Sequence, residues 1–350
     1  MTTTTERPPT PAPGRAPNLF GAAVKSVFTA RETSILIALL VIIAVTTIKN
    51  PSFLFSPDGF RDLLIAPALF VVLAVGQAMV IITRNVDLSV GSILGLSAYL
   101  TGVLFRDAPD LPVPVVMLLG ILFGTVLGLV NGALVAFARV PSLVITLGTL
   151  YAYRGINVAW TGSDRINASD MPDSFLEFGT GSLTVIPYLT IVALIVLVIA
   201  AWYLRNIRGG REFYAIGSDP DAANLYGLRV TRRVLVAFAV SGTLAGFAGV
   251  MYAARYGTVA SQAAAGFELT AVGAAVIGGV AIFGGSGTVW GAALGAVLLI
   301  TINRALPVLG IQDFWQRAVV GVLILSAIVL DRILALRQAK RLAVTEDSSV

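Results

Sequence analysis

Long apolar segments follow one another through most of this sequence, and they constrain its fold more than any other feature. Such segments lie near residues 34–49, 63–83, 88–105, 113–137, 141–160, 184–204, 234–255, 269–285, 288–306 and 315–331. About 20 helical residues cross a bilayer core, so most of these segments can span a membrane. Of the 350 residues, 57% are apolar and only 12% charged, too few charges to cover a water-soluble protein. We therefore predict an all-α integral membrane protein with about ten transmembrane helices; 88–105, 141–160 and 269–285 are the weakest candidates, and the shorter runs could be re-entrant.

The positions of arginine and lysine predict the orientation of these segments. The loop at 205–233 carries six arginines, whereas the loop at 161–183 carries one arginine and four acidic residues. Because positive residues accumulate in cytoplasmic loops, we expect 205–233 and both termini on the cytoplasmic side of a bacterial cytoplasmic membrane and 161–183 on its outer side. The expected organisation is a disordered tail (1–34), a transmembrane domain (35–331) and a cytoplasmic C-terminal tail (332–350).

Missing residue types limit the chemistry that this chain can perform. The sequence has no cysteine and no histidine, so it offers no thiolate nucleophile and no ordinary zinc or haem site. Without clustered carboxylates either, a membrane-embedded enzyme is a poor alternative. None of the three lysines, Lys25, Lys49 and Lys340, lies in an ATP-binding G-x-x-x-x-G-K-[ST] motif. We predict that the chain is not an enzyme and holds no cofactor or metal, so any ATP and Mg would be bound by a separate polypeptide. No continuous basic face points to nucleic acid.

The polar residues inside the apolar segments are mostly neutral. No deep carboxylate or lysine stands out, which argues against the alternative of an ion-coupled secondary sugar carrier. Arg154 and Arg304 are close enough to the outer ends of their segments to extend toward the interface. Neutral amides and hydroxyls suit a hydroxyl-rich solute, although they can also join helices. The candidates for a translocation pathway are Gln77, Asn131, Asn157, Ser241, Thr243 and Asn303.

Glycines at four-residue spacing mark two predicted helix contacts. Gly120, Gly124, Gly128 and Gly132 form one stripe, and Gly287, Gly291 and Gly295 form another. Such stripes let helix backbones approach closely in lipid, so we interpret them as packing seams.

The loop at 205–233 contains the signals of a short helix at 220–226. Asp219 is a suitable N-cap, Pro220 fits the first helical position and Gly227 suits the position after the helix. Asp221 lies at the positive end of the helix dipole. The helix would present an apolar surface formed by Ala222, Ala223, Leu225 and Tyr226. This surface suits the groove of a partner protein or the membrane surface.

The turn at 83–91 separates two apolar segments. Asp87 or Ser89 can cap the helix that follows. Alternatively, the turn could contact a cytoplasmic partner or form an inner gate.

Four ordered motifs resemble one known family, the ribose-type (simple-sugar) permeases of ABC importers. Residues 85–92 resemble its G-G-I-D-L-S-V-G-S signature, with Arg84 and Asn85 in place of the glycine pair. Residues 140–148 resemble its P-x-F-I-x-T-L-G segment. Residues 210–217 and 221–229 resemble its coupling loop, and 274–295 resemble its glycine-rich stretch.

This resemblance implies a type II ABC importer-like bundle that moves a monosaccharide or similar polyhydroxylated solute into the cytoplasm. It implies a dimer of permeases, identical or not, with a cytoplasmic ABC ATPase and an extracytoplasmic solute-binding protein that largely sets specificity. Family substrates include ribose, xylose, arabinose, galactose, rhamnose and the furanosyl autoinducer. The residues that it assigns to ATPase coupling are Gly217, Asp219, Pro220, Asp221, Ala222, Ala223, Leu225, Tyr226 and Gly227, and its motif turn contains Asn85, Asp87, Ser89 and Gly91.

Overall fold

The structure, a computed structural model, describes residues 30–138, 140–312 and several positions between 314 and 329. Most of the predicted N-terminal tail, part of the last predicted segment and the whole predicted C-terminal tail therefore lie outside the described residues. The helices are α2 (Ala30–Lys49), α3 (Ser52–Phe55), α4 (Pro57–Ile82), α5 (Val90–Asp107), α6 (Val113–Ala138), α7 (Ser142–Thr161), η1 (Ala168–Asp170), α8 (Asp173–Thr180), α9 (Tyr188–Asn206), α10 (Arg208–Ser218), α11 (Pro220–Leu225), α12 (Val230–Tyr256), α13 (Phe267–Ile277) and α14 (Val289–Val308). A small antiparallel hairpin pairs β1 (Ser182–Leu183) with β2 (Ile186–Pro187).

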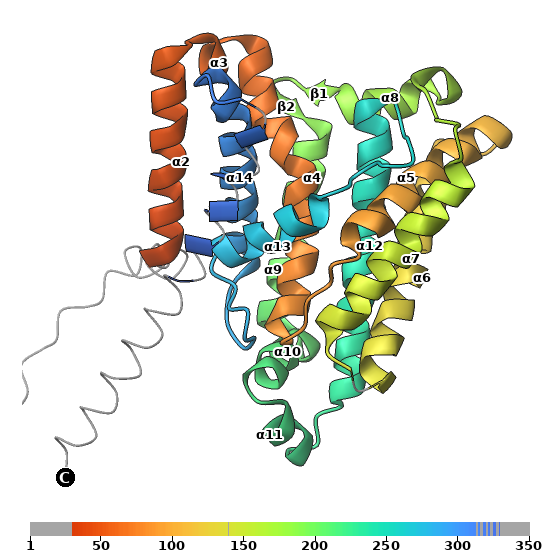
Figure 1. The fold of residues 1–350 in the computed structure, drawn as a ribbon, viewed down its shortest axis with the longest axis vertical. Coiled ribbons are helices and arrows are strands. Elements are labelled where there is room, and N and C mark those ends of the chain that lie inside the picture. Colours follow the sequence, from red (N-terminus) through yellow and green to blue (C-terminus); the bar gives the residue numbers. More distant parts are fainter. Residues whose placement is uncertain are drawn as a thin grey trace, which may run out of the picture.

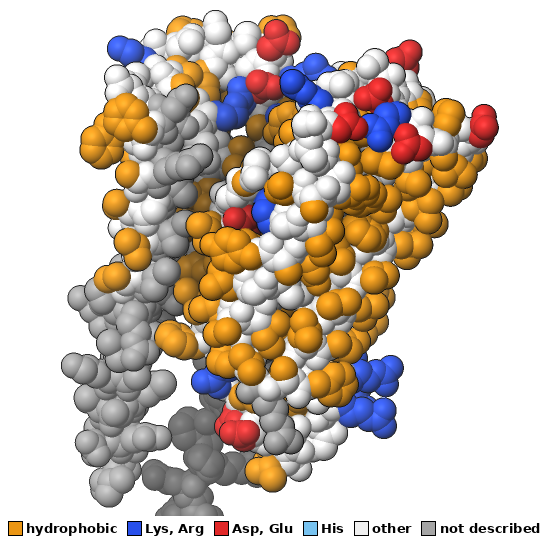
Figure 2. Space-filling view, turned by 45° about the vertical axis from the view of Figure 1, so that its right-hand side comes forward, with side chains coloured by type: hydrophobic (Ala, Val, Ile, Leu, Met, Phe, Trp, Pro, Cys, Tyr) orange, Lys and Arg blue, Asp and Glu red, His pale blue; other side chains and the backbone are white. Residues whose placement is uncertain are grey.

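The prediction of an all-α membrane protein is confirmed, although the number of spanning helices differs. Within the described residues, six helices are long and apolar enough to cross a membrane: α2, α4, α6, α9, α12 and α14. Figure 2 shows hydrophobic side chains over the middle of one face, with charged side chains gathered toward its two ends. Helices α5 and α7 have 18 and 20 residues but contain more polar residues, and α13 has only 11.

Two of the helices begin inside the bundle. In Figure 1 the chain turns back upward after α4, and α5 begins well above the lower end of α4. Likewise, the chain comes back down from the upper end of α12 before α13 begins. The predicted span at 269–285 is wrong in its second half, because α13 ends at Ile277 and left-handed glycines follow, among them Gly279 and Gly284. These interrupted helices leave non-helical backbone inside the protein, where neighbouring helices shield it from lipid.

Both glycine stripes are packing seams, as predicted. A side chain added at Gly124 would lie 2.5 Å from the Cα atom of Gly246 on α12, and one at Gly128 would lie 2.7 Å from the Cα atom of Gly242. Helices α6 and α12 therefore touch through their backbones. The second stripe brings α14 against α13, where Gly291 faces the carbonyl of Gly278.

The two ends of the bundle carry different elements. Helices α3 and α8 and the hairpin lie at the upper end in Figure 1, whereas α10 and α11 lie at the lower end. The acidic loop and the arginine-rich loop of the sequence are therefore at opposite ends of the molecule.

Candidate functional site

Asp87 is the centre of a buried hydrogen-bond network. Its Oδ1 atom accepts hydrogen bonds from the backbone N–H (3.0 Å) and the hydroxyl (2.6 Å) of Ser89. Its Oδ2 atom accepts one from the Ser241 hydroxyl on α12 (3.2 Å). Gln77 on α4 donates to the Asp87 carbonyl. Asp87 is fully buried, and these hydrogen bonds join the segment between α4 and α5 to α4 and α12.

Two further residues extend this network. Asn131 on α6 donates from Nδ2 to the Ser89 hydroxyl (2.6 Å), and its Oδ1 accepts from the Tyr153 hydroxyl on α7 (3.1 Å). The structure thus brings together three of the six pathway candidates, Gln77, Asn131 and Ser241. Their hydrogen bonds join helices. The sequence left this role open as the alternative to lining a pathway.

The other three candidates lie elsewhere. Thr243 forms a hydrogen bond with Thr125 of α6 (2.9 Å), and Asn303 is half-buried on α14. Asn157 is fully buried on α7 and donates to the carbonyl of Ser261 (3.0 Å). Asn157 therefore belongs to a second polar region, beside the non-helical chain that precedes α13.

The structure corrects the expectation that the interior lacks a carboxylate. Asp87 lies in the protein interior, although its place in the sequence suggested a surface turn. The residues at 83–89 are non-helical and fold back into the bundle, which carries Asp87 away from the end of α4. A pattern of apolar segments cannot show this, because it records where helices end and not where the chain goes next.

Two residues of the motif turn are inaccessible to a partner, although Arg84 of the same turn is exposed. Asp87 and Ser89 have no exposed surface, so they cannot contact a cytoplasmic protein. Neither side chain caps α5 in the usual way: Ser89 is the N-cap residue, but its hydroxyl bonds Asp87 and Asn131. Asn85 donates to the carbonyl of Thr83 (2.9 Å), and Gly91 lies directly against Glu268 of α13.

Helix α11 begins where the sequence predicted it to begin. The Asp219 side chain accepts from the backbone N–H groups of Asp221 and Ala222, both at 3.0 Å. The helix ends at Leu225, one residue before the predicted end, and Gly227 follows with a positive φ of 77°. Gly217 packs against the carbonyl of Ile82, which places α10 and α11 next to the end of α4.

The exposed surface of α11 differs from the predicted one. Leu225 and Tyr226 are 89% and 88% exposed, whereas Ala223 is buried and Ala222 is half-buried. Two adjacent large apolar side chains therefore project from this end of the protein.

An ion pair holds the arginine-rich loop onto the bundle. Glu212 on α10 accepts from Arg208 (2.8 Å) and from Arg233 on α12 (2.5 Å). The hydrogen bond from Arg233, followed by that from Arg208, lowers the pKa of the Glu212 carboxyl despite its partial burial. This pair links α10, and through it α11, to the first turns of α12.

A cleft of about 460 Å³ connects this loop to the motif turn. Its lining includes Arg84 and Asn85 from the turn, Pro220 from α11, and residues of α6, α7 and α12. Arg84 has a positive φ of 66° and packs against Gly284. Pro220 of α11 and the motif turn therefore line the same cleft.

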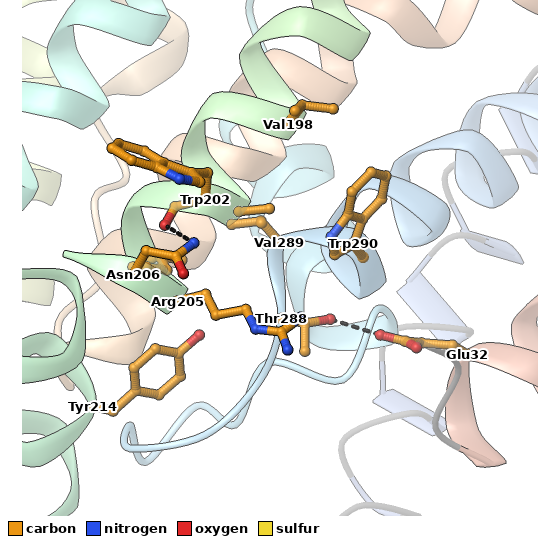
Figure 3. A pocket seen from close by; sticks show the side chains of 11 residues that line it. Glu32, Val198, Trp202, Arg205, Asn206, Tyr214, Thr288, Val289 and Trp290 are labelled. Atoms are coloured by element: carbon orange, nitrogen blue, oxygen red, sulfur yellow. Dashed lines mark hydrogen bonds between the residues drawn. The ribbon is translucent and has the colours of Figure 1, made fainter. Parts of the chain in front are cut away.

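A second cleft, of about 560 Å³, lies between the ends of α9 and α14 and the start of α2 (Figure 3). Trp202, Arg205 and Trp290 line it, and Thr288 donates to Glu32 (2.7 Å). None of the predicted pathway residues lines this cleft.

The opposite end of the protein carries the acidic loop. Arg106 pairs with Asp164 (2.6 Å) and Asp107 (2.8 Å), and its hydrogen bond lowers the pKa of the Asp164 carboxyl. Asp170 accepts from the backbone N–H of Asn167 (2.8 Å). Asp173 and Glu177, on α8, are exposed.

Comparisons with known proteins agree with this architecture. Residues 60–328 match the family described as branched-chain amino acid transport system / permease component. The autoinducer 2 import system permease protein LsrC of Enterobacter sp. (strain 638) is 36% identical over 90% of both chains. The proteins of the same name from Shigella flexneri and Photorhabdus luminescens are 35% and 34% identical over 86% of this chain and 86% and 89% of their own. No solved structure matches. The chain therefore belongs to this family of membrane permease components, which confirms the resemblance seen in its motifs.

Proposed function

We propose that this chain is the transmembrane subunit of an ATP-driven importer for a small sugar-like solute. The family match makes it a transport component, and the relatives described above are named for autoinducer 2 import. Its partners are then a second permease, a cytoplasmic ATPase and an extracytoplasmic binding protein. The end bearing α11 and the arginines faces the cytoplasm.

The single observation that carries this proposal is the exposed pair Leu225 and Tyr226 on a helix fixed at both ends. A capped helix with two projecting apolar side chains suits the groove of an ATPase. Glu212 and Arg233 would transmit its movement to α12, and the contact of Gly217 with the carbonyl of Ile82 would transmit it to the end of α4, where the motif turn begins. Closure of the ATPase subunits would thereby shift the Asp87 network and open the pathway at the dimer interface.

Substitution of Leu225 tests this coupling. We expect Leu225→Asp to place a charge in the ATPase groove and to uncouple ATP hydrolysis from uptake. Asn224→Asp is the matched control, because it adds the same charge to the same short helix at a neighbouring exposed position. The readout is solute taken up per ATP hydrolysed by the complete assembly in proteoliposomes. Full coupling in Leu225→Asp would refute the role of α11.

The acidic loop is our candidate for docking the binding protein. Asp173 and Glu177 are the suitable positions to change, because Asp164 is already paired with Arg106. We expect Asp173→Lys with Glu177→Lys to weaken docking, more strongly at low salt. Unchanged affinity across salt concentrations would dismiss this surface.

Two observations support second candidates. The family description names branched-chain amino acids, so labelled leucine belongs in the uptake screen beside sugars and autoinducer 2. The buried carboxylate of Asp87 revives an ion-coupled carrier, which predicts uptake by this chain alone, driven by an ion gradient without ATP.

A further inference from the structure

Two half-buried charged side chains lie where the interrupted helices α5 and α13 meet. Arg154 is the thirteenth residue of α7, about 18 Å along that helix. Instead of extending to the outer interface, its Nη1 atom donates to the carbonyl of Ala263 (2.6 Å). Glu268 lies in the first turn of α13. Charged residues within membrane-spanning regions are costly and usually serve a function.

The bonding capacity of these residues is only partly used. One oxygen of Glu268 accepts from the N–H of Gly266 (3.1 Å), but the other has no hydrogen-bond partner among the described residues. The Oδ1 atom of Asn157, a fully buried residue, also has none. Arg154 carries five N–H groups, of which one is bonded in the described part of the chain. Purely structural roles would leave buried polar atoms unpaired, and each of them costs stability.

Two glycines of α5 let these side chains approach the helix backbone closely. A Cβ atom at Gly91 would collide with Glu268, and one at Gly95 would lie 3.3 Å from Nδ2 of Asn157 and 3.5 Å from Nη1 of Arg154. The two glycines are one helical turn apart, so carboxylate and guanidinium flank one narrow stripe of α5. The two charged groups do not form an ion pair within 4.0 Å of each other. Both groups therefore keep hydrogen-bonding capacity for a third partner.

We propose that Arg154, Glu268 and Asn157 contact the solute in the middle of the pathway, and that they select a neutral molecule with adjacent hydroxyl groups. The opposite charges of Arg154 and Glu268 cancel, so neither an anion nor a cation is favoured overall. A carboxylate accepts from hydroxyl groups, a guanidinium donates to them, and the amide oxygen of Asn157 is one more acceptor. The proposal rests on the proposed import function and adds the site and the chemical class of the solute.

Substitutions that remove one charge at constant shape test the site. We expect Glu268→Gln and Arg154→Gln each to reduce uptake per ATP about tenfold or more, the loss typical of one charged hydrogen bond. Asp110→Asn, at an exposed acid outside the site, should behave like the wild type, and Arg154→Lys should recover part of the activity. Uptake is measured on the complete assembly with radiolabelled ribose, rhamnose and autoinducer 2. Melting temperatures of all variants identify any that are misfolded.

Cysteine labelling gives a second readout that needs no uptake. Because the chain has no cysteine, Ala265→Cys introduces one reactive thiol at an exposed position beside the site. We expect a charged methanethiosulfonate reagent to label this thiol, and ribose or autoinducer 2 to slow the labelling. Leu147→Cys, on the exposed apolar face of α7, is the control that should stay unlabelled.

The outcomes separate the two proposals. Wild-type uptake in both Glu268→Gln and Arg154→Gln, or no labelling of Ala265→Cys in any nucleotide state, would overturn the site while the import function stands. Uptake of leucine instead of the sugars by the wild-type assembly would overturn the solute class and the proposed function together.

Discussion

Substitution of Gly124 by alanine tests whether backbone contact holds α6 to α12. The new Cβ atom would lie 2.5 Å from Cα of Gly246, 2.6 Å from the carbonyl oxygen of Gly242 and 2.7 Å from N of Gly246. Ordinary contacts are 3.4–4 Å, so the two helices must separate by about 1 Å. Such overpacking costs about 1–3 kcal/mol.

A matched control accounts for the higher helix propensity of alanine relative to glycine. Replacing glycine by alanine within a helix stabilises it by about 1 kcal/mol, and this gain applies equally to Gly148, where an added Cβ meets nothing within 4 Å. We therefore expect Gly148→Ala to raise the unfolding free energy by up to about 1 kcal/mol. Gly124→Ala should be about 1–3 kcal/mol less stable than Gly148→Ala.

Unfolding of the purified chain in detergent, followed by circular dichroism during titration with a denaturing detergent, measures this difference. Equal stabilities, or a more stable Gly124→Ala, would refute the seam as a backbone contact. Gly155→Ala serves as a second control, because its Cβ also meets no atom within 4 Å.

Two further predictions follow from the polar contacts. The pKa of Glu212 is lower in the folded protein than its usual 4.5. The ionised carboxylate therefore stabilises the fold above pH 4.5, and this stabilisation is lost as the pH falls through the folded pKa. Glu212→Gln should flatten the acid limb of a curve of unfolding free energy against pH, and an unchanged curve would contradict the pairing with Arg233. Asp87→Ala should lower the unfolding free energy by about 1–3 kcal/mol, because Ser89 and Ser241 lose their acceptor; Asp87→Asn, which keeps one acceptor oxygen, should lose less in the same denaturation assay, and the reverse order would contradict the network.

Helix-capping residues and glycine spacing predicted the parts of the structure that depend only on residues close in sequence. Asp219, Pro220 and Gly227 fixed the ends of α11, since capping involves only neighbouring residues. The glycine stripes were also readable, because a four-residue period places small residues on one helix face. The exposure of Leu225 and the burial of Ala223 were not predictable, since they depend on how α11 packs against α12.

Interior charges escaped prediction for a different reason. The sequence placed Asp87 in a turn at the end of a span, and Arg154 near the outer end of another. Both assignments assumed that each apolar segment crosses the membrane completely. The available signal was the composition of the helices themselves, because α5 and α7 are more polar than the six clear spans.

That signal has a physical meaning for transport. A helix that is apolar throughout can only face lipid or pack, whereas a solute pathway needs polar groups and backbone that is released from regular helix. Segments 88–105, 141–160 and 269–285 were the weakest spans by sequence; the first two supply Gly91 and Arg154, and Glu268 directly precedes the third. If the proposed site is correct, the weakness and the function have one cause: these segments exchange apolar side chains and helical hydrogen bonds for polar groups that bind the solute.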